Sequence, residues 1–281
     1  MLTVDDKVLS DIARGFKVPA QPKLLLELQS IVEEEEPNLD LIAETISKDV
    51  GISATVLKTV NSPLYGLART VADIPLAVKY IGINGIVALV TSNLLRESFN
   101  QQQCSIPLEE FWETANNIAQ TMVFIAKHLG KRISSEKLFA IGLFHDCGIP
   151  VMAMKYKNYG KVLKLAEETP SKTLADIEEH AYKLNHATIG YYVASSWRLP
   201  VEICQIILRH NESTFLEKLD GSESQQCFAI LKMAEQIVHQ HKYFRAAPDW
   251  ENFADSVLTV LNCDDEALQD IFEDVVEQLS Q

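Results

Sequence analysis

The stretch Gly142-Leu143-Phe144-His145-Asp146-Cys147-Gly148 places adjacent histidine and aspartate residues directly after an apolar run. An imidazole nitrogen and a carboxylate oxygen from neighbouring residues can bind the same divalent ion. Single histidines further along the chain, His186 and His210, could complete its shell. Metal-dependent phosphohydrolases use such mixed shells to activate water. These four residues therefore form the candidate metal site of the chain.

The same residues also have an ordinary structural interpretation. A buried imidazole can hydrogen-bond to a neighbouring carboxylate and stay neutral, with no ion present. His210 ends a predicted helix, where a cationic side chain is favoured by the helix dipole. Cys147 has no recognisable base at a suitable spacing, so we interpret it as a small buried thiol. We expect a polar cluster that ties helices together in preference to a metal centre.

Composition and charge narrow the class of protein. The chain has 281 residues, 47% of them hydrophobic, and a net charge of −14. Such a composition is typical of a globular protein with a core, and such a charge argues against duplex nucleic acid or an anionic membrane as a partner. Five scattered cysteines without a C-x-x-C pair indicate a reducing compartment. With no signal peptide near Met1 and no apolar run of membrane-span length, we expect a cytoplasmic location.

Apolar residues recur at helical spacing, and strand-like alternation is nearly absent, so the predicted fold is all-α. One apolar stripe over residues 111–129 predicts a long helix that opens after Pro107 and closes at Gly130. Thr173 begins a capping box, and Pro200 opens a further helix toward His210.

Turn and loop residues suggest three parts. Residues 1–105 are expected to form an N-terminal bundle of short helices, 106–213 a helical core with all the candidate ligands, and 214–281 a C-terminal helical extension. In the first part, Asn61-Ser62-Pro63-Leu64-Tyr65-Gly66 is a helix stop followed by a turn. Turn surfaces often serve as interaction sites, which makes Lys58, Asn61 and Ser62 a candidate interaction turn.

Several short motifs together resemble a known family, the HDOD domain, a bacterial signalling relative of the HD metal-dependent phosphohydrolases. Besides the His-Asp stretch, the motifs are Pro19-Ala20-Gln21-Pro22, Ile46-Ser47-Lys48-Asp49, Leu57-Lys58-Thr59-Val60-Asn61-Ser62, Ala77-Val78-Lys79-Tyr80-Ile81-Gly82, Phe111-Trp112, His186-Ala187-Thr188-Ile189-Gly190, Trp197-Arg198-Leu199-Pro200 and His210. The resemblance covers roughly residues 15–240. It implies a helical bundle packed on an HD-like helical core.

The chain departs from the catalytically active HD relatives at several positions. The residue matching an early histidine ligand is Thr114, and a lysine suited to substrate phosphate is replaced by Ile149. The final aspartate of the pattern falls on Glu235, which could bind an ion as a weaker candidate. The paired histidines of the HD-GYP phosphodiesterases match His210-Asn211, and the Gly-Tyr-Pro signature is absent. These departures imply a degenerate metal site.

Two functions remain open. The favoured hypothesis is a non-catalytic module of bacterial signal transduction that binds other signalling proteins, with a nucleotide as a further candidate ligand and no cofactor expected. The alternative is a metal-dependent phosphohydrolase or phosphodiesterase acting on a nucleotide or cyclic dinucleotide. It would use one divalent metal ion held by His145, Asp146, His186 and His210. The sequence leaves the oligomeric state open.

Overall fold

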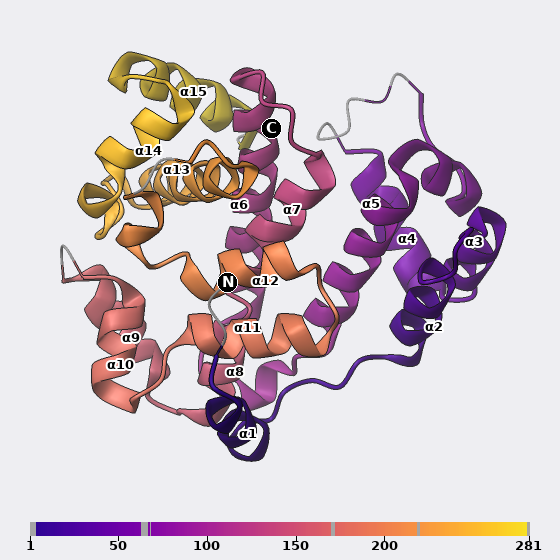
Figure 1. Ribbon diagram of the computed structural model, residues 1–281, viewed down its shortest axis with the longest axis horizontal. Coiled ribbons are helices and arrows are strands. Elements are labelled where there is room, and N and C mark those ends of the chain that lie inside the picture. Colours follow the sequence, from indigo (N-terminus) through magenta and orange to yellow (C-terminus); the bar gives the residue numbers. More distant parts are fainter. Residues whose placement is uncertain (1–3, 63–66, 68, 170–171, 218–219, 280–281) are drawn as a thin grey trace. The chain divides into compact units, whose positions relative to one another are not determined.

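The computed structural model describes residues 4–62, 67, 69–169, 172–217 and 220–279. Every regular element in this part of the chain is helical, which confirms the predicted all-α fold (Figure 1). The chain divides into two compact units. Unit 2 comprises Pro19–Phe99, and unit 1 combines Met1–Val18 with Asn100–Gln281. This division differs from the three expected parts, because the first residues and the C-terminal extension both belong to unit 1.

Unit 2 is a small helical bundle in which α3 and α4 pack on α5. Asn38, Asp49 and Asp73 cap the starts of α3, α4 and α5 with their side-chain oxygens, as polar residues do at helix N-termini. The chain kinks within α5 at Gly82, whose φ of 77° is outside the helical range. The helices are α2 (Lys23–Val32), α3 (Leu39–Ser47), α4 (Val50–Val60) and α5 (Ile74–Glu97).

The candidate interaction turn begins at the end of α4. Asn61 is the C-cap residue, and its amide group donates to Leu57 O and Val71 O while its Oδ1 accepts from Val71 N. Ser62 Oγ donates to Thr59 O, and Lys58 is exposed. Asn61 therefore holds the following segment against the helix end. The rest of the quoted turn, residues 63–66, lies outside the described residues, and the interaction role stays a prediction.

Unit 1 holds the long helix α6, which packs against α7 and α13 (Figure 1). The predicted boundaries are confirmed: α6 begins after Pro107, α12 begins after Pro200, and Thr173 forms a capping box with Asp176. The α-helices are α1 (Asp6–Gly15), α6 (Leu108–His128), α7 (Ser135–Phe144), α8 (Gly148–Lys155), α9 (Tyr159–Glu167), α10 (Leu174–Tyr182), α11 (His186–Ser196), α12 (Val201–Arg209), α13 (Glu223–Tyr243), α14 (Ala254–Leu261) and α15 (Asp265–Leu279). Short 3-10 turns are η2 (Gln101–Gln103), η3 (Ser213–Leu216) and η4 (Trp250–Asn252).

Two glycines of the His-Asp stretch set the positions of the helices around it. A Cβ on Gly142 would lie 2.5 Å from Ala119 Cα, so α7 crosses α6 at a distance that only glycine permits. A Cβ on Gly148 would lie 2.0 Å from the carbonyl oxygen of His186, so α8 is equally close to α11. Backbone contacts of this kind leave no space for a side chain. They bring His186 next to the His-Asp pair.

Two helical stretches are long and apolar enough to cross a membrane by length and composition, namely Ile74–Glu97 and Ser135–Lys155. The expectation that no apolar segment reaches this length is therefore wrong. The second stretch runs through α7 and α8, and 78% of its apolar window is buried inside the protein. Core helices of globular proteins pass the same test because they are apolar on all sides.

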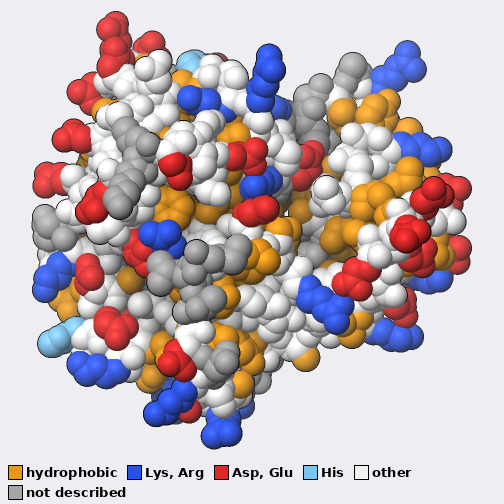
Figure 2. All heavy atoms as spheres, viewed as in Figure 1, with side chains coloured by type: hydrophobic (Ala, Val, Ile, Leu, Met, Phe, Trp, Pro, Cys, Tyr) orange, Lys and Arg blue, Asp and Glu red, His pale blue; other side chains and the backbone are white. Residues whose placement is uncertain are grey.

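The surface is acidic and mixed. Asp and Glu side chains are spread over the face seen in Figure 2, and Lys and Arg side chains stand among them singly or in small groups. Hydrophobic side chains are visible between the charged ones on the same face (Figure 2). Exposed hydrophobic residues of unit 2 include Leu26, Leu39, Leu41 and Val50.

Candidate functional site

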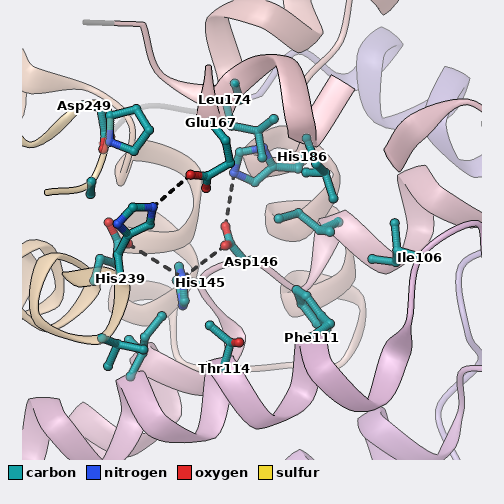
Figure 3. A pocket seen from close by; sticks show the side chains of 18 of the residues that line it. Ile106, Phe111, Thr114, His145, Asp146, Glu167, Leu174, His186, His239 and Asp249 are labelled. Carbon is teal, nitrogen blue, oxygen red and sulfur yellow. Dashed lines mark hydrogen bonds and ion pairs between the residues drawn. The ribbon is translucent and has the colours of Figure 1, made fainter. Parts of the chain in front are cut away.

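The four predicted site residues meet at one place in unit 1. His145 is the C-cap of α7, Asp146 follows it, His186 begins α11, and His210 is the C-cap of α12. The three histidines are buried, and Asp146 lies between His145 and His186 (Figure 3). All four residues line a cavity of about 540 Å³. The structure thus places every predicted ligand at the same cavity wall.

Each of the three imidazoles is oriented by an acceptor behind it. His145 Nδ1 donates to Gly142 O at 2.7 Å, and His210 Nδ1 donates to Ile207 O at 2.8 Å. His186 Nδ1 donates to Glu178 Oε2 at 2.6 Å. A carbonyl oxygen only accepts, so these bonds fix the Nδ1–H tautomer and leave Nε2 facing the cavity. Metal-binding histidines are commonly oriented in this way.

One oxygen of Asp146 faces two histidines, and we call this group the His186 side (Asp146 Oδ1, His186 and His210). Asp146 Oδ1 lies 3.2 Å from His186 Nε2 and 3.2 Å from His210 Nε2, and the two Nε2 atoms lie 3.2 Å apart. Neighbouring ligand atoms around a tetrahedral zinc ion lie roughly 3.3 Å apart, given bonds of about 2.0–2.1 Å. The triangle therefore fits one face of a single-ion coordination shell.

The other oxygen of Asp146 faces a different group, the His145 side (Asp146 Oδ2, His145 and Glu235). His145 Nε2 lies 3.2 Å from Asp146 Oδ2 and 3.6 Å from Glu235 Oε1. The second oxygen of Glu235 is held by the ammonium of Lys232 at 2.5 Å, and Asp249 lies 3.4 Å from the same ammonium. The weaker sequence candidate, Glu235, is thus near the cluster but already paired with a lysine.

The positions where the chain departs from active HD relatives line the same cavity. Thr114 lies on α6 near His145 (Figure 3), and its hydroxyl accepts a hydrogen bond from Lys242 Nζ at 3.3 Å. Lys242 is also ion-paired with Glu110 at 2.6 Å. Ile149 contributes a buried apolar side chain. Thr114, whose hydroxyl is bound to a lysine, therefore occupies the position where the resemblance implies a metal ligand. The aliphatic side chain of Ile149 occupies the position where the resemblance implies a contact with substrate phosphate.

The Asn211 amide lies against both histidines of the His186 side. Its amide nitrogen lies 2.8 Å from His210 Nε2 and 3.1 Å from His186 Nε2. The amide N–H can donate to the lone pair of the neutral His210 Nε2. To bind an ion here, the chain would have to rotate this amide N–H away from the two imidazoles.

The ionisable residues of the cluster shift one another's pKa values. Burial opposes ionisation of Asp146, but attraction to His145 and hydrogen bonds from the histidines outweigh it and lower its pKa well below the usual value. Burial also disfavours a charged His186, yet the Glu178 and Asp146 carboxylates raise its pKa to about 10. For His210, burial lowers the pKa. If His186 is an imidazolium and His210 is neutral, the Nε2–H of His186 can donate to Nε2 of His210. If both were neutral, the lone pairs of these two nitrogens would repel each other.

Sequence reasoning missed the carboxylate behind His186. Glu178 on α10 is fully buried and accepts hydrogen bonds from the backbone and the imidazole of His186 and from the hydroxyl of Tyr159. Nothing in the local sequence separates it from its exposed neighbour Glu179. A buried charge that accepts three hydrogen bonds is satisfied, and it fixes the orientation of the imidazole.

His239 and Cys147 also lie near the cluster. His239 lines the cavity and lies 2.9 Å from Glu167 Oε2 (Figure 3). Cys147 is fully buried, its Sγ lies 3.6 Å from Gly190 O, and burial raises the pKa of its thiol. A thiol of this kind is not a nucleophile at neutral pH.

Comparison with known proteins gives the family of the chain. The family model for the HDOD domain matches residues 18–213. The structure is similar to a "Putative phosphohydrolase" from Shewanella amazonensis SB2B, with a TM-score of 0.69, 20% identity and coverage of 96% of this chain and 93% of that one. It is also similar to a "Putative signal transduction protein" from Marinobacter aquaeolei VT8, with a TM-score of 0.71, 19% identity and coverage of 97% and 62%.

Sequence comparison also finds a longer relative. An uncharacterized protein from Treponema pallidum is 27% identical over 216 residues, which cover 74% of this chain. The matched region spans 40% of the length of that relative. At these identities the structural likenesses establish the fold alone.

Proposed function

Because the chain belongs to the HDOD domain family, we propose that it is a regulatory module of bacterial signal transduction, located in the cytoplasm. In this proposal it acts by binding another signalling protein and does not turn over a phosphate ester. The "Putative signal transduction protein" from Marinobacter aquaeolei VT8, which has the same fold, supports this class of function.

One observation carries the non-catalytic part of the proposal. On the His145 side, the matching ligand position is Thr114 bound to Lys242, and Glu235 is held by Lys232. Hydrolysis at a two-metal site needs both ions to stabilise the attacking and leaving oxygens. A side that has lost an imidazole and gained nearby ammonium groups is poorly suited to a second ion.

The cavity suits a small ligand as well as a structural role. Its walls combine the polar cluster with apolar side chains such as Phe111 and Ile149. Cavities that pair apolar walls with a few oriented polar groups commonly bind small molecules. A nucleotide bound without cleavage would fit a module that senses a ligand and passes the signal to a partner protein.

Phosphodiesterase assays test the proposal directly. The full chain is incubated with Mn²⁺, Fe²⁺ or Zn²⁺ and with cyclic dinucleotides or bis(p-nitrophenyl) phosphate. We expect no more product than with an Asp146→Asn variant, which removes the bridging carboxylate but keeps the size of the side chain. Turnover by the wild-type chain that disappears in this variant would contradict the proposal.

A second candidate function is favoured by the 3.2 Å triangle of the His186 side. Asp146, His186 and His210 would hold one divalent ion, which when bound would supply an activated water for hydrolysis of a phosphate ester. Glu178 would orient His186, and Asn211 would turn its amide away. This candidate predicts that His186→Gln removes both the bound ion and the turnover in folded protein, and normal turnover in that variant would reject it.

A further inference from the structure

We propose that the ammonium group of Lys232 serves as a built-in cation of the His145 side and keeps a second divalent ion out of the cluster. The role assigned to Lys232 concerns which cation the cluster holds, and it does not depend on whether the chain binds a signalling protein. In this proposal, Lys232 determines how many metal ions the cluster can bind.

Lys232 is placed in an environment that is unusual for a lysine. Its side chain is 4% exposed, although it lies in the middle of α13 among apolar residues. Lysine is rarely buried to this extent unless it is paired. The partners here are Glu235 Oε2 at 2.5 Å and Asp249 Oδ2 at 3.4 Å, and the ammonium also lies 4.4 Å from the centre of the Phe253 ring. The lysine is therefore held as a charged group inside the protein.

Glu235 links this ammonium to the histidine cluster. Its Oε2 is bound to Lys232, while its Oε1 is buried, has no hydrogen-bond donor among the residues that the structure describes and lies 3.6 Å from His145 Nε2. A divalent ion on the His145 side would need this carboxylate and Asp146 Oδ2 as ligands. It would then share Glu235 with an ammonium a few ångströms away. Like charges at such separations repel strongly when they are screened by protein rather than water.

Among the described contacts of the His186 side there is no lysine or arginine, and a proton on His186 Nε2 would leave as that nitrogen becomes a metal ligand. The Nε2 atom of His210 lies next to the Asn211 amide. The imidazoles of His186 and His210 are oriented by Glu178 and by the carbonyl oxygen of Ile207. An amide can rotate to offer oxygen, whereas an ammonium cannot become a ligand while it is charged. The two sides of Asp146 therefore differ in kind. One can accept an ion, and the other already contains a fixed positive charge.

Metal stoichiometry tests this inference. The purified chain and a Lys232→Met variant are dialysed against Mn²⁺ or Zn²⁺, and bound metal is measured by elemental analysis and by titration calorimetry. Methionine removes the charge but keeps an unbranched chain that packs in apolar surroundings. We expect at most one ion on the wild-type chain. For Lys232→Met we expect a second ion, with an affinity for that side at least about tenfold above the wild type, or about 1.4 kcal/mol.

Two controls separate this effect from general electrostatics. Lys137 pairs with Glu223 at 2.7 Å, and neither residue lines the cavity, so Lys137→Met should leave the stoichiometry unchanged. The double variant Lys232→Met with Glu235→Gln should lose the second ion, because the released ligand is gone. A similar gain in Lys137→Met, or a second ion that persists in the double variant, would overturn the assignment.

The test remains decisive if Lys232→Met does not fold. Lys232→Gln keeps a donor for Glu235 without the charge and should give the same gain of an ion, with circular dichroism to verify folding. Two ions on the wild-type chain, or no gain in a folded neutral variant, would overturn the role of Lys232. Phosphodiesterase activity at the His186 side would contradict the proposed function and leave this result unaffected.

Discussion

Glu178 Oε2 lies 2.6 Å from Nδ1 of His186 and 2.8 Å from its backbone nitrogen, so one buried carboxylate accepts hydrogen bonds from both the imidazole and the backbone of this residue. The contact joins α10 to the first residue of α11. It also sets which nitrogen of His186 faces the cavity. The cluster therefore depends on a residue that is neither one of the predicted ligands nor part of the family motifs.

Removal of the Glu178 charge should destabilise the protein. In Glu178→Gln, His186 loses its buried ionic partner, and breaking such a pair costs about 3–5 kcal/mol. We expect a loss of about 3 kcal/mol in the free energy of unfolding, measured by urea denaturation. Glu179→Gln changes an exposed neighbour and should have an effect within about 0.5 kcal/mol. A loss below about 1 kcal/mol in Glu178→Gln would show that the pair contributes little.

Stability should fall as the pH rises above neutrality. The pKa of His186 is about 10 in the folded protein and 6.5 in its ordinary state. Between these values the folded chain holds a proton that the unfolded chain has released, so the stabilisation is complete below 6.5 and is lost as the pH approaches 10. The slope would reach about −1.4 kcal/mol per pH unit. Urea denaturation at several pH values should show this slope in the wild type and a shallower one in Glu178→Gln, and equal slopes would contradict the assignment.

Gly148 should tolerate no side chain. In Gly148→Ala the new Cβ would lie 2.0 Å from the carbonyl oxygen of His186, which is backbone and has no easy movement. We expect a loss of about 3 kcal/mol or more in stability and a displaced His186. Gly160→Ala is the matched control, because its Cβ would meet Ser105 O only at 3.7 Å, and it should change stability by less than about 1 kcal/mol. Similar effects in the two variants would disprove the close contact of α8 and α11.

Restoring the missing imidazole should not restore hydrolysis. In Thr114→His an imidazole returns to α6 near His145, but Lys232 still holds Glu235 and Ile149 is still apolar. We expect no turnover of bis(p-nitrophenyl) phosphate above that of Thr114→Ala, with Mn²⁺ present. Turnover in Thr114→His would mean that the absence of a histidine at position 114 is sufficient to explain the lack of hydrolysis.

The helices were largely predictable because their signals are local. Pro107 and Pro200 precede the starts of α6 and α12, and Thr173 meets its capping partner three residues later. The division into units was less predictable. Helix α1 packs on α11, far away in the sequence, and this contact moves the first residues into unit 1. A pattern of neighbouring residues contains no information about such a contact.

The grouping of the candidate site residues was predictable, but their surroundings were not. His145, Asp146, His186 and His210 were selected by residue type and position along the chain, and all four line one cavity. Lys242 reaches Glu110 from 132 residues away, and its effect on Thr114 follows from that long-range packing. Lys232 did leave a signal, a charged residue within the apolar run of 229–234 on a predicted helix. Such a residue is a candidate for a buried ion pair.

Anomalous scattering from crystals soaked in Mn²⁺ tests most directly whether the two sides of Asp146 differ. The account predicts at most one peak, within bonding distance of Asp146 Oδ1, His186 Nε2 and His210 Nε2, and no peak between His145 and Glu235 while Lys232 remains on Glu235. Two peaks bridged by Asp146, with the Lys232 side chain moved away from Glu235, would contradict it.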